Sequence, residues 1–239
     1  MLALLQNLVR RAGLDASRCP VCGALTHGAE KLCSCCEDRL ALRNGGYCPT
    51  CGEMFGDDDA VPAVCPECLH APPPWDRLAF YAPYAGVLRD LILHFKFNGA
   101  YGNARLLGEL ARQAAELHLT EQADGVIPVP LHRRRLAWRG FNQSSELGRA
   151  VAKALDIPLW NHALTRTRYT QPQTTLDRNE RQQNIKNAFA ARNEIIDGKR
   201  ILLVDDVYTT GATLRECART LRRAGATSVD VLVLARTQH

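Results

Sequence analysis

The sequence predicts a two-part α/β protein in which a small cysteine-rich domain precedes a domain built on a parallel sheet. Eight of the ten cysteines form four C-x-x-C pairs before residue 70. After three prolines at 72–74, short apolar runs alternate with segments whose apolar residues recur at helical spacing. Such alternation is typical of parallel strands connected by helices. A chain of 239 residues is long enough for one such domain and a smaller companion.

Residues 1–18 predict an amphipathic segment ahead of the cysteine pairs, because Leu4, Leu5, Leu8 and Val9 fall at helical spacing. Its apolar run is too short to cross a bilayer, and its arginines follow that run instead of preceding it. We therefore expect no transmembrane segment, no secretion signal and a cytoplasmic protein. Packing on the chain's own surface is the favoured role of the segment, and contact with the inner face of the membrane is the alternative.

The cysteine spacing predicts a double zinc ribbon over residues 19–74. Two residues between thiolates let one tight turn present both sulfurs to a tetrahedral ion, and four thiolates close a structural site. Four pairs therefore imply two structural zinc ions. The predicted ligands are Cys19, Cys22, Cys33 and Cys36 in the first ribbon, and Cys48, Cys51, Cys65 and Cys68 in the second.

The spacing leaves three alternatives to this ligand set. Cross-bracing of the four pairs stays open, and Cys35 is close enough in sequence to replace a neighbouring ligand. A disulfide framework is the main rival, but it would require the secretion signal that the chain does not contain. Cys217 shares a helical face with apolar residues, so we expect it in the core.

Zinc binding also changes the net charge of the protein. Eight thiolates and two Zn²⁺ ions alter the formal net charge of +5 by −8 + 4 = −4, to about +1.

The join between the two parts lies near Pro74, because the prolines of "APPPWDRL" stiffen the chain and end any helix. This leaves residues 75–239 for the second domain. Apolar residues at helical spacing predict amphipathic helices over Val87–Phe95 and Leu106–Leu117.

A strand, loop and helix unit then occurs twice. "GVIPVP" at 125–130 predicts a buried strand, and Leu147–Leu155 predicts the helix that follows it. The unit returns as "RILLVDD", the turn "VYTTGAT" and the helix "LRECARTLRRAG", before a last strand over Ser228–Ala235. Repetition of this unit predicts a parallel sheet with helices on its faces.

The stretch "ILLVDDVYTTGAT" predicts a ribose-phosphate site. Ligands of parallel sheets bind beyond the carboxyl ends of the strands, where Asp205 and Asp206 stand. The turn after them opens a helix, and its free backbone N–H groups suit a phosphate. The carboxylates can accept hydrogen bonds from sugar hydroxyls or face Mg²⁺. The alternative is that both aspartates only cap the turn. Neither a P-loop nor a dinucleotide fingerprint occurs.

These residues resemble a known family. "ILLVDDVYTTGAT" is similar to the phosphoribosyl pyrophosphate (PRPP) signature of type I phosphoribosyltransferases. Together with the paired cysteines, "HFKFNG", "VPVPLHRRRLAWRGFNQ" and "RNERQQNIKNAF", it resembles the ComF family, whose members serve DNA uptake and natural competence. The resemblance extends from about Cys19 to Arg236.

The resemblance implies a double zinc ribbon followed by a type I phosphoribosyltransferase-like domain that binds PRPP with Mg²⁺. Asp205 and Asp206 would bind the ribose hydroxyls. The 5-phosphate would lie at Thr209, Thr210, Gly211, Ala212 and Thr213, and the pyrophosphate at the loop of Val129, Pro130, Leu131 and His132. The sequence identifies neither a catalytic residue nor the acceptor substrate.

Basic and aromatic residues near these loops suit single-stranded DNA, whose bases stack and whose phosphates attract arginine. The segment between Thr165 and Asn187 is polar and is expected to be either a mobile loop that covers the substrate or a plain linker. Trp138, Phe141 and Tyr169 offer stacking faces, and a solvated basic face is the alternative. The candidate nucleic-acid contacts are Arg133, Arg134, Arg135, Arg139, Arg178 and Arg181.

Three functions follow from these observations. The first is a PRPP-binding protein of DNA uptake or utilisation that contacts single-stranded DNA and proteins of the uptake machinery. The second is a metabolic phosphoribosyltransferase that transfers ribose phosphate to a base or related nucleophile. The third is a non-enzymatic docking scaffold, which the intact acid pair and turn argue against.

Overall fold

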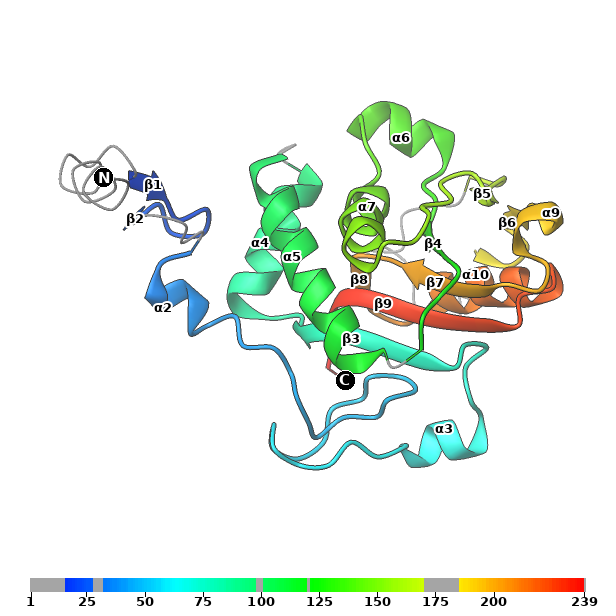
Figure 1. Cartoon of the computed structure of the whole chain (residues 1–239), viewed down its shortest axis with the longest axis horizontal. Coiled ribbons are helices and arrows are strands. Elements are labelled where there is room, and N and C mark those ends of the chain that lie inside the picture. The colour runs from blue at the N-terminus through cyan, green and yellow to red at the C-terminus, as the bar shows by residue number, and fades with distance from the viewer. Residues whose placement is uncertain (1–15, 28–31, 98–100, 120, 170–184, 239) are drawn as a thin grey trace.

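The computed structural model places a parallel sheet at the centre of the chain (Figure 1). It describes residues 16–27, 32–97, 101–119, 121–169 and 185–238. The predicted N-terminal segment before residue 16, and the candidate contacts Arg178 and Arg181, lie outside these ranges. The strands pair in parallel in the order β3 (Arg77–Pro83), β9 (Ser228–Arg236), β7 (Arg200–Val204) and β4 (Gly125–Pro128), with the short β8 (Val207–Tyr208) beside the end of β9.

Helices cover both faces of the sheet, as the alternating pattern predicts. Successive strand side chains point to opposite faces, so Leu202 packs in one apolar cluster and Leu203 in the other. Burial on both faces explains why the strands are continuous apolar runs. The first cluster lies under α4 (Gly86–Phe97), α5 (Tyr101–His118) and α7 (Gln143–Leu155), and the second under α10 (Ala212–Arg223). Cys217 is fully buried in the second cluster, where the sequence placed it.

Two elements differ from the sequence-based expectation. β3 is a strand that no pattern in the sequence predicts, and it forms the edge of the sheet directly after the proline run. α6 (Arg133–Arg139) makes the arginine-rich stretch after the β4 loop helical. His132 caps it, because the ring Nδ1 accepts a hydrogen bond of 3.2 Å from the backbone N–H of Arg134.

The predicted mobile loop is flanked by a two-stranded antiparallel sheet. β5 (Leu164–Arg166) pairs with β6 (Phe189–Ala191), and α9 (Asn193–Ile196) follows β6. Most of the segment between these strands lies outside the described residues, and its role stays a prediction.

The first ribbon stands at the side of the α/β body in Figure 1, where β1 (Ala16–Arg18), β2 (Leu25–His27) and α2 (Ser34–Glu37) are visible. Its knuckle is closed by two backbone hydrogen bonds, from Cys19 N to Ala24 O at 2.8 Å and from Gly23 N to Cys19 O at 2.9 Å. Gly23 has a φ of +74°, and no atom lies within 4 Å of where its Cβ would be.

The second ribbon, which ends in α3 (Pro66–His70), is fused to the edge of the sheet. The backbone N–H of Leu78 in β3 donates to Pro49 O at 2.8 Å, and Trp75 Nε1 donates to Thr50 O at 2.7 Å. Tyr47 and Trp75 are buried in the α10-side cluster. This ribbon therefore completes the core beside β3.

No helix in the described part of the chain is both long and apolar enough to span a bilayer.

The two knuckle glycines provide a test of this fusion. Gly52 has a φ of +69°, close to that of Gly23, but a Cβ there would lie 2.8 Å from both Arg236 Cδ and Leu78 Cδ2. Alanine should cost about 1–2 kcal/mol at either site through the left-handed backbone. Gly52→Ala should lose a further ~1–3 kcal/mol through overpacking. Urea unfolding of the zinc-loaded variants measures the difference, and equal losses would contradict a knuckle packed on the sheet.

Candidate functional site

A cavity of about 790 Å³ opens at the carboxyl edge of the sheet, where β4 and β7 end side by side. Pro128 is paired with Val204, and the N–H of Val129 donates to Val204 O at 2.9 Å. The loop after β4 and the acid pair after β7 therefore leave the sheet at the same level, which is where parallel sheets bind ligands.

The acid pair lies on the cavity wall and is held by two helices. Ser144, in the first turn of α7, donates from Oγ to Asp205 Oδ1 at 2.8 Å, and the N–H of Asp206 donates to the same oxygen at 3.0 Å. Lys96, at the end of α4, lies with Nζ 2.9 Å from Asp206 Oδ1. Each carboxylate thus has a partner from an element far away in sequence.

Burial sets the protonation of this pair. Burial first, and the charge of Asp206 second, raise the pKa of Asp205 from 3.8 to about 7. Burial alone would lower the pKa of Lys96, but the charge and hydrogen bond of Asp206 outweigh it and raise that pKa. Asp205 therefore exchanges a proton near neutral pH beside a charged lysine. A hydroxyl donor or a cation that reached this wall would favour the ionised form.

The turn after β8 forms an adjacent wall suited to an anion. Gly211 caps α10 with a φ of +70°, and a Cβ there would lie 2.6 Å from Tyr208 Cε2, so only glycine fits. The buried Oγ1 of Thr210 has no hydrogen-bond partner among the described residues. The first turn of α10, with Ala212 and Thr213, contains no acidic residue. Free N–H groups at such a helix start favour phosphate.

The loop after β4 forms the third wall. Val129, Pro130 and Leu131 line the cavity, and Asn142 Nδ2 donates to Val129 O at 3.1 Å. His132 caps α6 and is outside the lining set. The loop is therefore fixed at one end by the residue that caps α7 and at the other by α6.

Four of the described arginines line the cavity, Arg134, Arg135 and Arg139 on α6 and Arg166 at the end of β5. Arg139 Nη1 donates to Gln143 Oε1 at 2.9 Å, and the Arg134 guanidinium lies 5.4 Å from the centre of the Tyr169 ring. Burial, with the charge of Arg135 second, lowers the pKa of Arg166 to about 10. Of the predicted arginines, the cavity lining includes Arg134, Arg135 and Arg139 and leaves out Arg133.

Several residues that line this cavity had no predicted role in it. Lys96 lies within "HFKFNG" and Gln143 ends "RGFNQ", but neither was assigned a role. Arg166 was expected only to give the polar segment after Thr165 a basic character, and Ser144 was not singled out. Gln143 is only 2% exposed, and its Nε2 has no partner among the described residues. Nothing local in the sequence assigns these side chains to the site, because tertiary packing brings them there.

The cysteines form two clusters outside the cavity. The four sulfurs of each ribbon lie within 4.8 Å of one another, in sequential order and not cross-braced. The Cys51 thiol and the backbone N–H of Cys65 favour the Cys48 thiolate and lower its pKa to about 4, although burial opposes them. Four sulfurs on two tight turns fit tetrahedral Zn²⁺ with no open position, so the metal would supply folding energy.

Family models match both parts of the chain. A double zinc ribbon domain matches residues 14–69, and a phosphoribosyl transferase domain matches residues 142–239. The parallel sheet and the two cysteine clusters agree with these matches, so the predicted fold class is confirmed.

Several curated proteins are similar over most of the chain. Competence protein F of Haemophilus influenzae is 35% identical over 227 residues, which cover 92% of this chain and 96% of that protein. DNA utilization protein YhgH of Escherichia coli K12 is 38% identical, and the match covers 86% of this chain and 97% of that protein. Competence protein ComFC of Bacillus subtilis is 31% identical, with coverages of 87% and 85%.

The raised pKa of Asp205 predicts an inverted pH dependence of stability. Because the folded pKa of about 7 exceeds the ordinary 3.8, the folded state binds the proton more tightly, and this carboxyl loses stability as pH rises between those values. Asp205→Asn should therefore be more stable than the parent at pH 8, with a difference that vanishes near pH 4. Thermal unfolding across this range measures it.

Asp124→Asn is the matched control of opposite sign. The backbone N–H of Arg200 lowers the pKa of Asp124, so its carboxylate stabilises the fold at high pH and loses that effect as pH falls. A stability gap for Asp205→Asn that did not change with pH would contradict the raised pKa.

Proposed function

The chain belongs to the ComF family of competence and DNA utilization proteins, and we propose that it binds PRPP with Mg²⁺ and contacts single-stranded DNA at the same edge of the sheet. The observation that carries the proposal is the meeting of an acid pair and an anion-binding turn in one cavity. The two features suit the two parts of a ribose phosphate, which are its hydroxyls and its 5-phosphate.

In this proposal the ligand is divided between the walls. Asp205 and Asp206 accept hydrogen bonds from the ribose hydroxyls, while the backbone of Thr209–Thr213 and the Thr210 hydroxyl donate to the 5-phosphate. Thr210 is outside the lining set, but its neighbours Thr209 and Gly211 line the cavity, and its hydroxyl has no hydrogen-bond partner among the described residues, which supports this division.

The pyrophosphate then faces the loop after β4. Gln143 Nε2 is a buried donor on this side, and the arginines of α6 supply positive charge. Mg²⁺ would neutralise the pyrophosphate and relieve the repulsion between it and the acid pair. Loss of pyrophosphate needs no covalent protein group, since positioning and charge stabilisation suffice for such a step.

DNA contact is proposed at the outer rim of the cavity, on α6. No residue of this helix is buried, and Trp138 is 76% exposed beside three consecutive arginines. Tyr169, packed against Arg134 and His132, adds a second ring on this rim. Exposed rings among arginines suit stacked bases and phosphates of a single strand. The names of the relatives, which refer to competence and DNA utilization, support this partner.

We place this activity in the cytoplasm, where thiols stay reduced and able to bind zinc, and at the inner face of the membrane when proteins of the uptake machinery deliver the strand there. The zinc ribbons are structural in this proposal.

Calorimetric titration with PRPP and Mg²⁺ tests the pocket. The parent should bind, and Asp205→Asn/Asp206→Asn should bind about 100-fold more weakly, because charged acceptors contribute roughly 1.5–3 kcal/mol to such hydrogen bonds. Asp124 precedes β4 at the amino ends of the strands, whereas the cavity lies at their carboxyl ends. Asp124→Asn is therefore the matched control and should bind like the parent.

No heat from the parent would refute the pocket assignment. Release of pyrophosphate in the same samples on addition of free nucleobases would instead support a metabolic transferase.

Fluorescence anisotropy with a labelled oligothymidylate tests the DNA surface. Affinity should fall as salt rises, and each of Arg134→Gln and Arg135→Gln should reduce the slope of log K against log salt by about 0.7. Trp138→Ala should weaken binding by about 1–3 kcal/mol and leave the slope unchanged.

Arg223→Gln, at the far end of α10, removes an exposed arginine away from the cavity and should change neither affinity nor slope. Binding that ignored salt, or equal effects of Arg134→Gln and Arg223→Gln, would count against a DNA surface on α6.

A further inference from the structure

The phosphate-binding turn rests on the side chain of Tyr208. This tyrosine is 5% exposed, and its ring fills the space where Gly211 would have a Cβ, with Cε2 at 2.6 Å and the hydroxyl oxygen at 2.7 Å from that position. Any displacement of the ring therefore changes the space available to the turn.

Two side chains hold the Tyr208 ring. Trp75 meets it edge-on, with ring centroids 6.1 Å apart, and the guanidinium of Arg236 lies 5.2 Å from its centroid. The backbone is held as well, because the N–H of Thr237 donates to Tyr208 O at 3.0 Å. The hydroxyl of Thr237 approaches the carbonyl oxygen of Thr209 at 3.5 Å.

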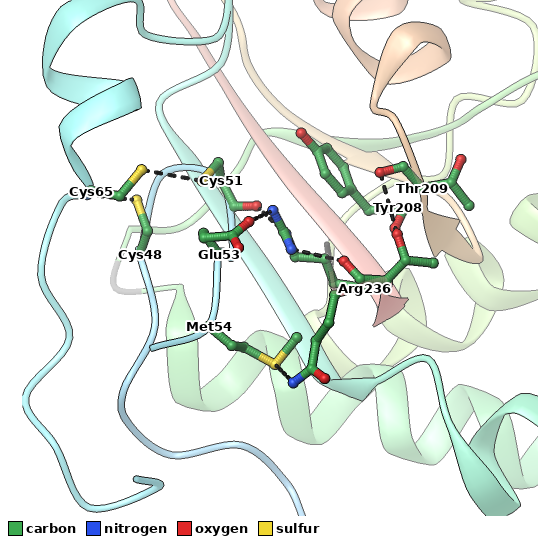
Figure 2. Close-up of polar contacts among 10 residues, drawn as sticks. Cys48, Cys51, Glu53, Met54, Cys65, Tyr208, Thr209 and Arg236 are labelled. Atoms are coloured by element: carbon green, nitrogen blue, oxygen red, sulfur yellow. Dashed lines mark hydrogen bonds and ion pairs between the residues drawn. The ribbon is translucent and has the colours of Figure 1, made fainter. Parts of the chain in front are cut away.

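Both side chains that hold the ring are tied to the second zinc knuckle. Trp75 Nε1 donates to Thr50 O at 2.7 Å, and Arg236 Nε donates to Cys51 O at 2.7 Å. Arg236 also forms an ion pair with Glu53, and Figure 2 shows its guanidinium between this knuckle and the Tyr208 ring. Arg236 is only 3% exposed, so these contacts satisfy a buried charge.

The carbonyls involved belong to the turn "CPTC" that presents Cys48 and Cys51 to the metal. A closed tetrathiolate site fixes the backbone of such a turn, and without metal the turn loses its main source of order. The contacts run without a break from this turn through Arg236 and Trp75 to Tyr208 and Gly211.

We propose that the second zinc knuckle positions the phosphate-binding turn through Arg236, Trp75 and Tyr208. Arg236 and Tyr208 are positioning residues, since they act on the ligand only through the turn. The identity of the ligand rests on the proposed function, whereas the order of the turn does not. By thermodynamic reciprocity, a ligand held by the turn tightens zinc binding at the second ribbon by the same factor.

Hydrogen exchange of residues 205–214 in the ligand-free, zinc-loaded protein tests the positioning directly. Arg236→Gln should raise the amide exchange rates of this segment, because the Tyr208 ring loses the guanidinium packed against it and with it the connection to Cys51 O. Trp75→Phe keeps an aromatic ring but loses the hydrogen bond to Thr50 O, and should have a smaller effect in the same direction. Trp75→Phe also keeps the inference testable if Arg236→Gln fails to fold.

Arg43→Gln is the matched control. Arg43 also donates to carbonyls of the second ribbon, at Gly46 and Gly56, but it contacts neither Arg236 nor Tyr208. It should leave the exchange of residues 205–214 unchanged. Equal exchange in Arg43→Gln and Arg236→Gln would overturn the inference, whatever ligand the cavity binds.

Ribose 5-phosphate supplies the second readout, because it lacks the pyrophosphate that would itself bind zinc. Arg236→Gln should lower its affinity about tenfold, within the range of coupled sites. In a competition with a chelator, saturating ribose 5-phosphate should lower the dissociation constant of one of the two zinc ions about tenfold in the parent and in Arg43→Gln. In Arg236→Gln it should change the dissociation constant of neither ion.

The outcomes separate the two proposals. If the parent binds no ribose 5-phosphate while Arg236→Gln still loosens the turn, the proposed function fails and the positioning role stands. If the parent binds it but zinc retention does not respond in any variant, the coupling fails and the pocket stands.

Discussion

The parallel register of β4 against β7 is the constraint on which the cavity depends. Pairing of Pro128 with Val204 brings the loop after β4 and the acid pair after β7 to one edge of the sheet. The helices that follow begin at this edge, and the first turns of both α7 and α10 line the cavity. Two helix starts thus meet at one volume, an arrangement that would suit the anionic ligand proposed above.

The same geometry places two carboxylates side by side, with Asp206 buried and Asp205 half-buried. Adjacent buried charges cost stability unless they are paired or protonated, and here Lys96 pairs with Asp206 while Asp205 shifts its pKa. Arginines that also line the cavity add a positive field, because the charges of Arg139 and Arg166 act on Asp206 and Asp205. The cavity therefore presents acidic and basic groups to the same volume, which suits the proposed ligand with both hydroxyls and phosphates. Titratable groups with shifted pKa values, such as Asp205, are typical of functional sites.

Local patterns in the sequence predicted the parts of the molecule whose geometry is local. C-x-x-C turns, the run from β7 into α10 and the apolar periodicity of α5 each depend on residues a few positions apart. β3 was missed because its seven residues follow a proline run and are buried on both faces, so no alternation marks them. Lys96 and Ser144 were missed for a different reason. Their partners lie 110 and 61 positions away, and only the packing of α4 and α7 on the sheet brings them together.

The two ribbons show the limit of arguing from spacing alone, since their knuckles have the same C-P-x-C-G pattern and near-identical glycine φ values. Around Gly23 the space is open, whereas Gly52 lies against Arg236, Leu78 and Phe80 of the sheet. Tyr47, which precedes the second knuckle, is buried with residues of β3 and β9. The apolar core therefore crosses the sequence boundary predicted near Pro74. Unfolding the second ribbon would expose β3 and remove the carbonyls that hold Trp75 and Arg236 against Tyr208, so zinc bound at that ribbon would stabilise the α/β domain as well as its own loop.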